Sequence, residues 1–163
     1  MRLIPSERVV SAPEEMHSLG VDLARELGAG DLVVLTGPLG AGKTTLTRGI
    51  GEGLDVRGPV TSPTFVLART HPSLSGGPPL VHVDAYRLGD AMELDDLDID
   101  FEHSVVVVEW GKGLLDGVAE RWIEVEISRP TGAPAEGAIT DASWEPSADV
   151  ADEPRTVRIA RRP

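Results

Sequence analysis

The sequence predicts an α/β fold, in which a mainly parallel sheet is flanked by helices and has antiparallel edge strands near the C-terminus. Three observations lead to this prediction. Residues 32–35 and 105–108 are unbroken aliphatic runs, which are typical of parallel strands covered on both faces. The first run leads through a glycine-rich loop into a helical pattern. Residues 122–127 instead alternate apolar and acidic side chains, which indicates a half-exposed strand near a sheet edge.

The glycine-rich loop, residues 37–44, reads Gly-Pro-Leu-Gly-Ala-Gly-Lys-Thr and matches G-x-x-x-x-G-K-[ST] at every required position. Its small residues let successive backbone N–H groups curl around a phosphate, and the helix that begins near Lys43 directs its positive end at the same oxygens. Lys43 adds a point charge at the outer phosphates, and the Thr44 hydroxyl can join the ligands of Mg²⁺. We therefore expect a nucleoside triphosphate to bind here, on a P-loop NTPase-like fold.

The composition limits the class of protein. With 163 residues we expect one domain, residues 1–163, which is large enough to bury a core without disulfides. The chain has no Cys, which excludes thiol nucleophiles and thiolate metal sites and fits a reducing cytosol. No apolar run approaches the roughly 20 residues of a membrane span, and the N-terminus lacks a secretory apolar core. We therefore expect a cytoplasmic protein without a membrane partner.

The charge of the chain bears on its partners. The net charge is −12, from 15 basic and 27 acidic residues. A protein that holds DNA or RNA unaided neutralises phosphates with clustered Lys and Arg, so independent tight binding of nucleic acid is not expected. If the pathway involves RNA, another subunit should supply the basic surface.

The two expected helices flank the first aliphatic strand. The first helix is expected to end at about Leu27, before Gly28, and Ser11 and Glu14 have the spacing of a capping box at its start. The second helix follows the glycine-rich loop. Its glycines each cost about 1 kcal/mol relative to Ala, so this helix is predicted to end or loosen near Gly51.

Two acids stand at the ends of expected strands. Residues 80–84 read as a strand that ends in Asp84, at the position where open parallel sheets place their ligands. Glu109 directly follows the second aliphatic run as a Walker-B-type acid, which would hold Mg²⁺ opposite Thr44, directly or through water. Period-two geometry also puts His82 on the same face as Asp84. We expect Asp84 to be catalytic or in the metal shell, and Glu109 to be a metal or water ligand.

Four further segments have less specific patterns. Residues 61–64 contain three hydroxyl side chains, which are ordinary turn chemistry or a segment that senses the terminal phosphate and Mg²⁺. The acidic residues 90–100 form a solvated face or a docking surface for a basic partner. Residues 129–154 are rich in Pro, Gly, Ala and acids, and are expected to be a flexible loop. Residues 155–161 alternate again and are expected to pair with residues 122–127, which opposite charges would favour.

Other chemistries have less support. The chain has no Asn, so it lacks the N-K-x-D segment with which a GTPase reads guanine. Its four His have no metal-ligand spacing, and no Ser-His-Asp arrangement is convincing. A small-molecule kinase remains an alternative, although the only cations between residues 60 and 120 that could cover a transferring phosphate are Arg69, Arg87 and Lys112.

Four motifs follow one another within about residues 31–128. They are the glycine-rich loop with Thr45 after it, Thr-Ser-Pro-Thr-Phe at residues 61–65, His-Val-Asp-Ala-Tyr-Arg-Leu at 82–88, and Val-Glu-Trp at 108–110. Together they closely resemble the motif series of the TsaE family, bacterial ATPases of tRNA threonylcarbamoyladenosine biosynthesis. The resemblance implies a small Mg²⁺-dependent P-loop ATPase that is weak alone and stimulated by partners. Those partners are a TsaD-like threonylcarbamoyl transferase and its TsaB-like paralogue, which modify the adenosine beside the anticodon of certain tRNAs.

The resemblance also implies roles for single residues. Glu109 would be a magnesium ligand, Asp84 could orient the attacking water, and residues 62–64 would lie near the terminal phosphate as a switch-like loop. tRNA would be bound only through the complex, which agrees with the acidic charge of this chain. The long insertion after Arg129 departs from the family pattern and leaves a C-terminal nucleotide contact, such as one from Arg155, open. The residues implied to contact ATP are Gly40, Ala41, Gly42, Lys43, Thr44 and Thr45, with Lys43 and Asp84 as the catalytic pair.

We hypothesise that ATP and Mg²⁺ order the loop around residues 61–64 and so favour docking on the transferase assembly. Hydrolysis would then remove these contacts and reset the complex. Two alternatives stay open. One is a nucleotide-gated interaction module in which binding without hydrolysis does the work, and the other is the small-molecule kinase.

Overall fold

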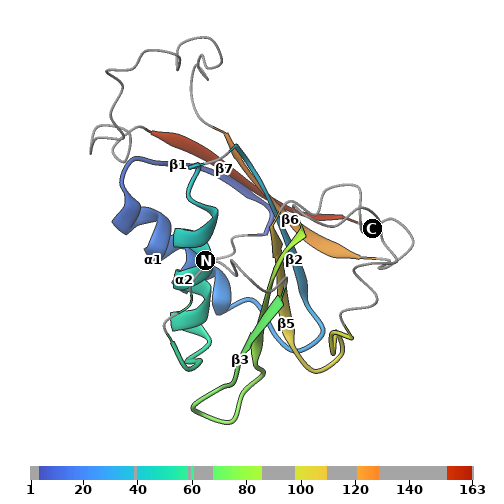
Figure 1. The fold of residues 1–163 in the computed structure, drawn as a ribbon. Helices are drawn as coiled ribbons and strands as arrows, with labels where there is room; N and C mark the ends of the chain where they lie inside the picture. Colours follow the sequence, from blue (N-terminus) through green and yellow to red (C-terminus); the bar gives the residue numbers. More distant parts are fainter. Residues whose placement is uncertain are drawn as a thin grey trace, which may run out of the picture.

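The computed structural model describes residues 4–38, 40–58, 60, 68–85, 98–109, 121–128 and 154–162. Within these ranges, seven strands form one sheet, and two helices lie together along one side of it (Figure 1). The helices are α1 (Pro13–Ala24) and α2 (Lys43–Gly53). The strands are β1 (Ser6–Val10), β2 (Leu32–Thr36), β3 (Ala68–His71), β4 (Leu80–Asp84), β5 (Val105–Glu109), β6 (Trp122–Ser128) and β7 (Arg155–Arg162).

The sheet is mixed, and its strands follow the order β1-β7-β6-β2-β5-β4-β3. The centre is parallel, because β2 pairs in parallel with both β5 and β6, and β4 pairs in parallel with β5. Both margins are antiparallel: β3 pairs with β4, and β7 pairs with β6 and β1. The predicted parallel centre is therefore confirmed. The described pairings divide equally between parallel and antiparallel, so the sheet is mixed and not mainly parallel, and its edge strands are β1 and β3 and not the C-terminal strands β6 and β7.

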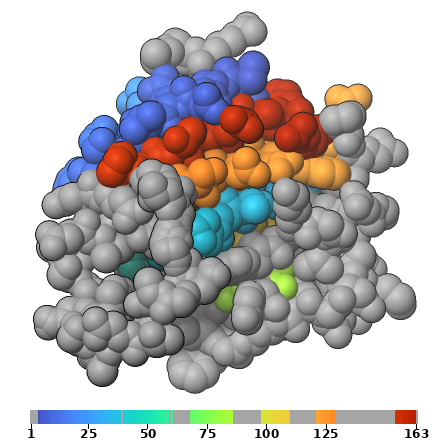
Figure 2. Space-filling view, turned by 90° about the horizontal axis from the view of Figure 1, so that it is seen from above, coloured from blue at the N-terminus to red at the C-terminus, as the bar shows by residue number. Residues whose placement is uncertain are grey.

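The expected pairing of β6 with β7 is confirmed, but β6 is not near an edge. It lies between β2 and β7, and β1 covers the far side of β7. The acidic residues of β6 form ion pairs with arginines of β7. Arg162 Nε lies 2.8 Å from Glu124 Oε2, and Arg158 Nη1 lies 3.9 Å from Glu126 Oε1. Opposite charges on β7 therefore allow an alternating, half-exposed strand to lie inside the sheet. Figure 2 shows the N-terminal segment, β7 and β6 as adjacent bands on one face of the molecule.

The central strands bury both of their faces. Val33 and Leu35 of β2 belong to an apolar cluster that includes residues of α1 and α2. Leu32 and Val34 belong to a second cluster on the opposite face, against which Phe101 packs. We call the first side the helix-side face of the sheet. This double burial explains why the sequence reads as continuous aliphatic runs at β2 and β5.

The helices α1 and α2 cross at glycines. A Cβ atom placed on Gly49 would lie 2.1 Å from the carbonyl oxygen of His17, and one placed on Gly20 would lie 2.3 Å from that of Leu46. Helix α2 continues through Gly51 and ends at Gly53, two residues beyond the predicted end near Gly51. The glycines lower helix propensity, but they let the two helix backbones touch, and tertiary packing outweighs the propensity.

Helix α1 differs from its prediction at both ends. Its N-cap is Ala12, and no side chain makes a capping hydrogen bond, so the predicted capping box is wrong. The backbone satisfies part of this end instead, because the Glu15 and Met16 N–H groups both bond to the Ala12 carbonyl. The helix ends at Ala24, before the expected Leu27.

Several predictions lie outside the described residues. They concern the hydroxyl-rich residues 61–64, most of the acidic stretch 90–100, Arg87, Lys112 and all but the last residue of the expected loop 129–154. The single-domain boundary also stays a prediction. Among the described helices, neither is long and apolar enough to cross a membrane.

Candidate nucleotide site

The glycine-rich loop joins the end of β2 to the start of α2. Gly40 has a φ of 79° and Gly42 a φ of 112°, a left-handed conformation that glycine adopts without steric cost from a Cβ atom. Helix α2 begins at Lys43, and its N-cap Gly42 offers no capping side chain. The first N–H groups of a helix lack intrahelical partners and carry the positive end of its dipole. The described part of the loop therefore has the geometry of an anion cradle.

The side chain of Lys43 is hydrogen-bonded to the backbone of its own loop. Its Nζ donates hydrogen bonds to the carbonyl oxygens of Gly37, at 2.8 Å, and Pro38, at 3.0 Å, and the residue is only 5% exposed. Burial lowers the pKa of the Lys43 ammonium below its usual value, while the negative charges of Glu109 and Asp84 act to raise it. The lysine therefore lies within electrostatic reach of both predicted acids. The fold brings these three predicted site residues together.

The two acids occupy equivalent positions on neighbouring strands. Asp84 ends β4, Glu109 ends β5, and the two residues are direct partners in the parallel register. Both acids lie on the helix-side face. Leu80 is an even number of residues from Asp84 on β4, as Val107 is from Glu109 on β5, and both apolar residues belong to the cluster that includes α1 and α2. Glu109 is 5% exposed, whereas Asp84 is partly exposed. The two acids, each predicted separately at the end of a strand, therefore lie side by side at the carboxyl ends of β4 and β5.

His82 is a site residue that the sequence reasoning did not identify. It is fully buried, and its Nε2 lies 2.5 Å from Oε2 of Glu109. The two-residue period placed His82 on the face of Asp84, but only the parallel register of β4 on β5 brings it beside Glu109. The only available signal was therefore the shared face.

Arg155 reaches the loop from the other side. It is the first residue of β7 and is 6% exposed, and its Nη2 donates a hydrogen bond to the carbonyl oxygen of Gly40 at 3.1 Å. Arg155, for which the sequence left a nucleotide contact open, is therefore hydrogen-bonded to the loop backbone, and its contact with a nucleotide stays a prediction.

The donor set fits Mg²⁺ bound together with a triphosphate. Thr44 and Thr45 are half-buried in the first turn of α2, and Ala41 is fully buried. The Thr44 hydroxyl and the Glu109 carboxylate are oxygen donors, and Mg²⁺ in proteins commonly takes one or two such ligands together with substrate phosphates and water. Among the described residues, no group of three or more His, Asp or Glu forms a metal site by itself.

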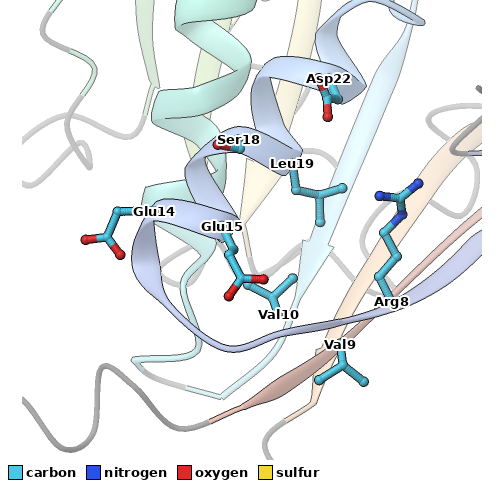
Figure 3. A pocket seen from close by; sticks show the side chains of 8 residues that line it. All are labelled: Arg8, Val9, Val10, Glu14, Glu15, Ser18, Leu19 and Asp22. Carbon is cyan, nitrogen blue, oxygen red and sulfur yellow. The ribbon is translucent and has the colours of Figure 1, made fainter.

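A second hollow lies between β1 and α1 (Figure 3). Arg8 and Val10 on the strand face Glu15 and Leu19 on the helix. With Glu14 and Asp22 the lining carries three carboxylates and one guanidinium, which disfavours an anionic ligand. The glycine-rich loop and the strand-end acids take no part in this lining, so the loop is the better candidate for a triphosphate.

Fold and site define the class as a mixed α/β protein in which a glycine-rich loop links a central strand to a helix, beside two strand-end carboxylates. A family model described as "Threonylcarbamoyl adenosine biosynthesis protein TsaE" matches residues 10–135. The chain belongs to this TsaE family, and the resemblance seen in its motifs is confirmed. The match ends before β7, so it does not include Arg155.

Individual relatives agree with the family. A protein of Streptomyces coelicolor is 60% identical over 124 residues, which cover 74% of this chain and 84% of the relative. One of Mycobacterium tuberculosis is 54% identical, covering 71% and 74%, and one of Bacillus subtilis is 37% identical, covering 72% and 73%. All three are called "tRNA threonylcarbamoyladenosine biosynthesis protein TsaE". A crystal structure of YdiB from Bacillus subtilis matches with a TM-score of 0.65 and 26% identity, covering 95% of this chain and 84% of that one.

Proposed function

We propose that this protein is a Mg²⁺-dependent, cytoplasmic P-loop ATPase that assists a threonylcarbamoyl transferase complex. The complex would form N6-threonylcarbamoyladenosine beside the anticodon of tRNA. The observation that carries this proposal is the convergence of Lys43, Asp84 and Glu109 at the glycine-rich loop. The names of the relatives support the pathway, because each specifies tRNA threonylcarbamoyladenosine biosynthesis.

The loop residues would bind and orient the phosphates. The backbone N–H groups of the turn around Gly40 and Gly42 supply donors, and the start of α2 adds its positive end. The Lys43 ammonium is held on the carbonyls of Gly37 and Pro38, so it is fixed next to the cradle before nucleotide arrives. A charge placed in advance costs no reorganisation during the reaction.

The two carboxylates would have different roles, one in binding the metal and one in orienting water. Glu109 and Thr44 would hold Mg²⁺, which when bound neutralises charge on the β- and γ-phosphates. Asp84 is the more exposed of the two acids and would orient the attacking water and accept its proton. Since the two acids are strand partners, each can act on one side of the same phosphate chain.

A switch in the segment 61–64 would connect this site to partner proteins. Val60, directly before the segment, is 6% exposed, and its carbonyl accepts a hydrogen bond from Arg48 Nε of α2 at 3.1 Å. The helix that carries Lys43 and Thr44 therefore also holds Val60, the residue that precedes the segment in sequence. We propose that ATP binding favours docking on a TsaD-like transferase and its TsaB-like paralogue, that hydrolysis resets the complex, and that tRNA is held by the partners.

The test is ATP hydrolysis and tRNA modification by the purified chain, with and without the two partners and tRNA. We expect weak hydrolysis alone and stimulation in the complex. Lys43→Ala should lower ATP affinity about 10–100-fold, because it removes a charged donor from the phosphate site. Arg25→Ala, at the exposed residue that follows α1, is the control. Parental ATP turnover and modification in Lys43→Ala would refute the proposal.

The same assay separates the alternatives. A nucleotide-gated module would support modification in Asp84→Asn protein that binds ATP without hydrolysing it. A small-molecule kinase would consume ATP only when a hydroxyl compound is added, and would need no partner protein.

A further inference from the structure

We propose that His82 is a positioning residue that holds the Glu109 carboxylate in the orientation in which it binds Mg²⁺. This inference rests on the proposed function, because it concerns the metal ligand of the same site. It assigns a role to a side chain for which the sequence analysis proposed none.

The first support is the geometry of the pair. Nε2 of His82 lies 2.5 Å from Oε2 of Glu109, and the residues are 0% and 5% exposed. His82 is the strand partner of Val107, so Glu109 is two residues further along the same face of β5. The contact therefore runs diagonally between adjacent strands, and water has almost no access to it.

The second support is the hydrogen bonding of the two ring nitrogens of His82. A carboxylate accepts hydrogen bonds, so Nε2 must carry the hydrogen of this contact. Nδ1 is buried and has no hydrogen-bond partner among the described residues. The neighbouring positions of β4 are Val81 and Val83, so an aliphatic residue would suit the strand without leaving a polar atom unsatisfied. The bond to Glu109 is the feature of this structure that accounts for a histidine here.

The third support is that the contact with His82 uses only one of the two carboxylate oxygens of Glu109. His82 engages Oε2, and the other carboxylate oxygen, Oε1, has no part in this hydrogen bond. Without His82, Glu109 could turn towards the nearby Lys43 ammonium, whose charge it already influences. Hydrogen bonds to ligating carboxylates fix their orientation, and losing such a partner typically lowers metal affinity or activity about 10–100-fold.

The experiment compares His82→Gln with His82→Asn. Both replace the ring by an amide of similar polarity, but only Gln is long enough to put its N–H₂ group near the position of Nε2. Calorimetry would give the Kd of a non-hydrolysable ATP analogue with Mg²⁺ and with a chelator. The ratio of these two Kd values measures how much Mg²⁺ tightens binding, and circular dichroism would check folding.

We expect the metal-free Kd to stay within about threefold in both variants, because the phosphate loop is intact. The Mg²⁺ ratio should fall about 10-fold or more in His82→Asn and stay near parental in His82→Gln. If His82→Asn does not fold, His82→Leu takes its place as the variant that removes the hydrogen bond, and combining it with Glu109→Gln completes a cycle in which the two changes should not add. Equal, parental ratios in folded His82→Asn and His82→Gln, or additive effects in the cycle, would overturn the positioning role. Absence of any saturable binding by the parental protein would instead overturn the proposed function.

Discussion

The guanidinium of Arg155 donates a hydrogen bond to the carbonyl oxygen of Gly40, at 3.1 Å, across 115 positions of sequence. The contact ties the first residue of β7 to the middle of the glycine-rich loop. The guanidinium is always charged and its residue is 6% exposed, so the bond is a charge-assisted one that water hardly weakens. The shape of the loop thus depends on a residue outside the segment that matches the family.

Replacing Arg155 by Ala should destabilise the protein and loosen the loop. A hydrogen bond from a charged, buried donor contributes about 1.5–3 kcal/mol, so we expect a loss of that size in the free energy of unfolding and a weaker affinity for ATP. Urea unfolding and nucleotide titration measure both effects. Arg158→Ala is the matched control on the same strand, because Arg158 pairs with Glu7 at the surface and exposed ion pairs contribute little. Equal effects of the two variants would contradict this interpretation.

Gly49→Ala should be destabilising although Ala is the better helix former. The added methyl group would meet the His17 carbonyl oxygen at 2.1 Å, so α1 and α2 must separate. Overpacking of this kind typically costs about 1–3 kcal/mol, which exceeds the gain of about 1 kcal/mol in helix propensity. Gly28→Ala is the control, since nothing lies within 4 Å of its added atom. Thermal unfolding compares them, and a Gly49→Ala protein as stable as the parent would show that the helices can separate at no cost.

His71 should make the protein less stable in mild acid. Its burial lowers its pKa below 6.5, and the nearby His82 and Arg69 add to this, while the hydrogen bond to the Arg57 carbonyl opposes it. Between the folded-state pKa and pH 6.5 the unfolded chain binds the proton and the folded chain does not. Stability is therefore fully present above about pH 6.5 and is lost as the pH falls through the folded-state pKa.

The free energy of unfolding falls by about 1.4 kcal/mol for each factor of ten by which His71 binds a proton more weakly in the folded than in the unfolded state. His71→Gln should remove that part of the pH dependence, which denaturant unfolding between pH 4.5 and 7.5 would measure. His103→Gln, on an exposed turn, is the comparison variant. If His71→Gln and the parent lose stability equally on acidification, His71 is not the source.

Asp84→Asn should separate ATP binding from turnover. The amide keeps the size of the carboxylate but cannot accept a proton, and general acid–base groups typically contribute about 10²–10⁴-fold to a rate. We expect turnover to fall by that factor while ATP affinity changes less than about threefold, measured by phosphate release and calorimetry. Asp22→Asn, on the exposed side of α1, should retain parental turnover. Parental turnover in Asp84→Asn would remove Asp84 from the mechanism.

Features that depend on neighbouring residues could be predicted from the sequence, whereas features that depend on contacts between distant segments could not. The position of the loop at residues 37–44, between a strand and a helix, could be predicted because its motif consists of consecutive residues with small side chains. Asp84 and Glu109 could be predicted because each ends a strand recognisable from its own composition. Helix α2 runs two residues beyond its predicted end near Gly51, because the propensity of its glycines was weighed without the close approach of α1 at Gly49, which no local pattern contains.

By itself the sequence determined the glycine-rich loop, the strand-end acids and the membership of the family, since all three depend on short stretches of consecutive residues. Only the tertiary structure decided which side chains support them. The register of β4 on β5 put His82 on Glu109, and the pairing of β7 with β1 and β6 put Arg155 on the loop. These contacts join segments far apart in the chain, and their partners are selected by strand order and packing, for which one sequence carries no local signal.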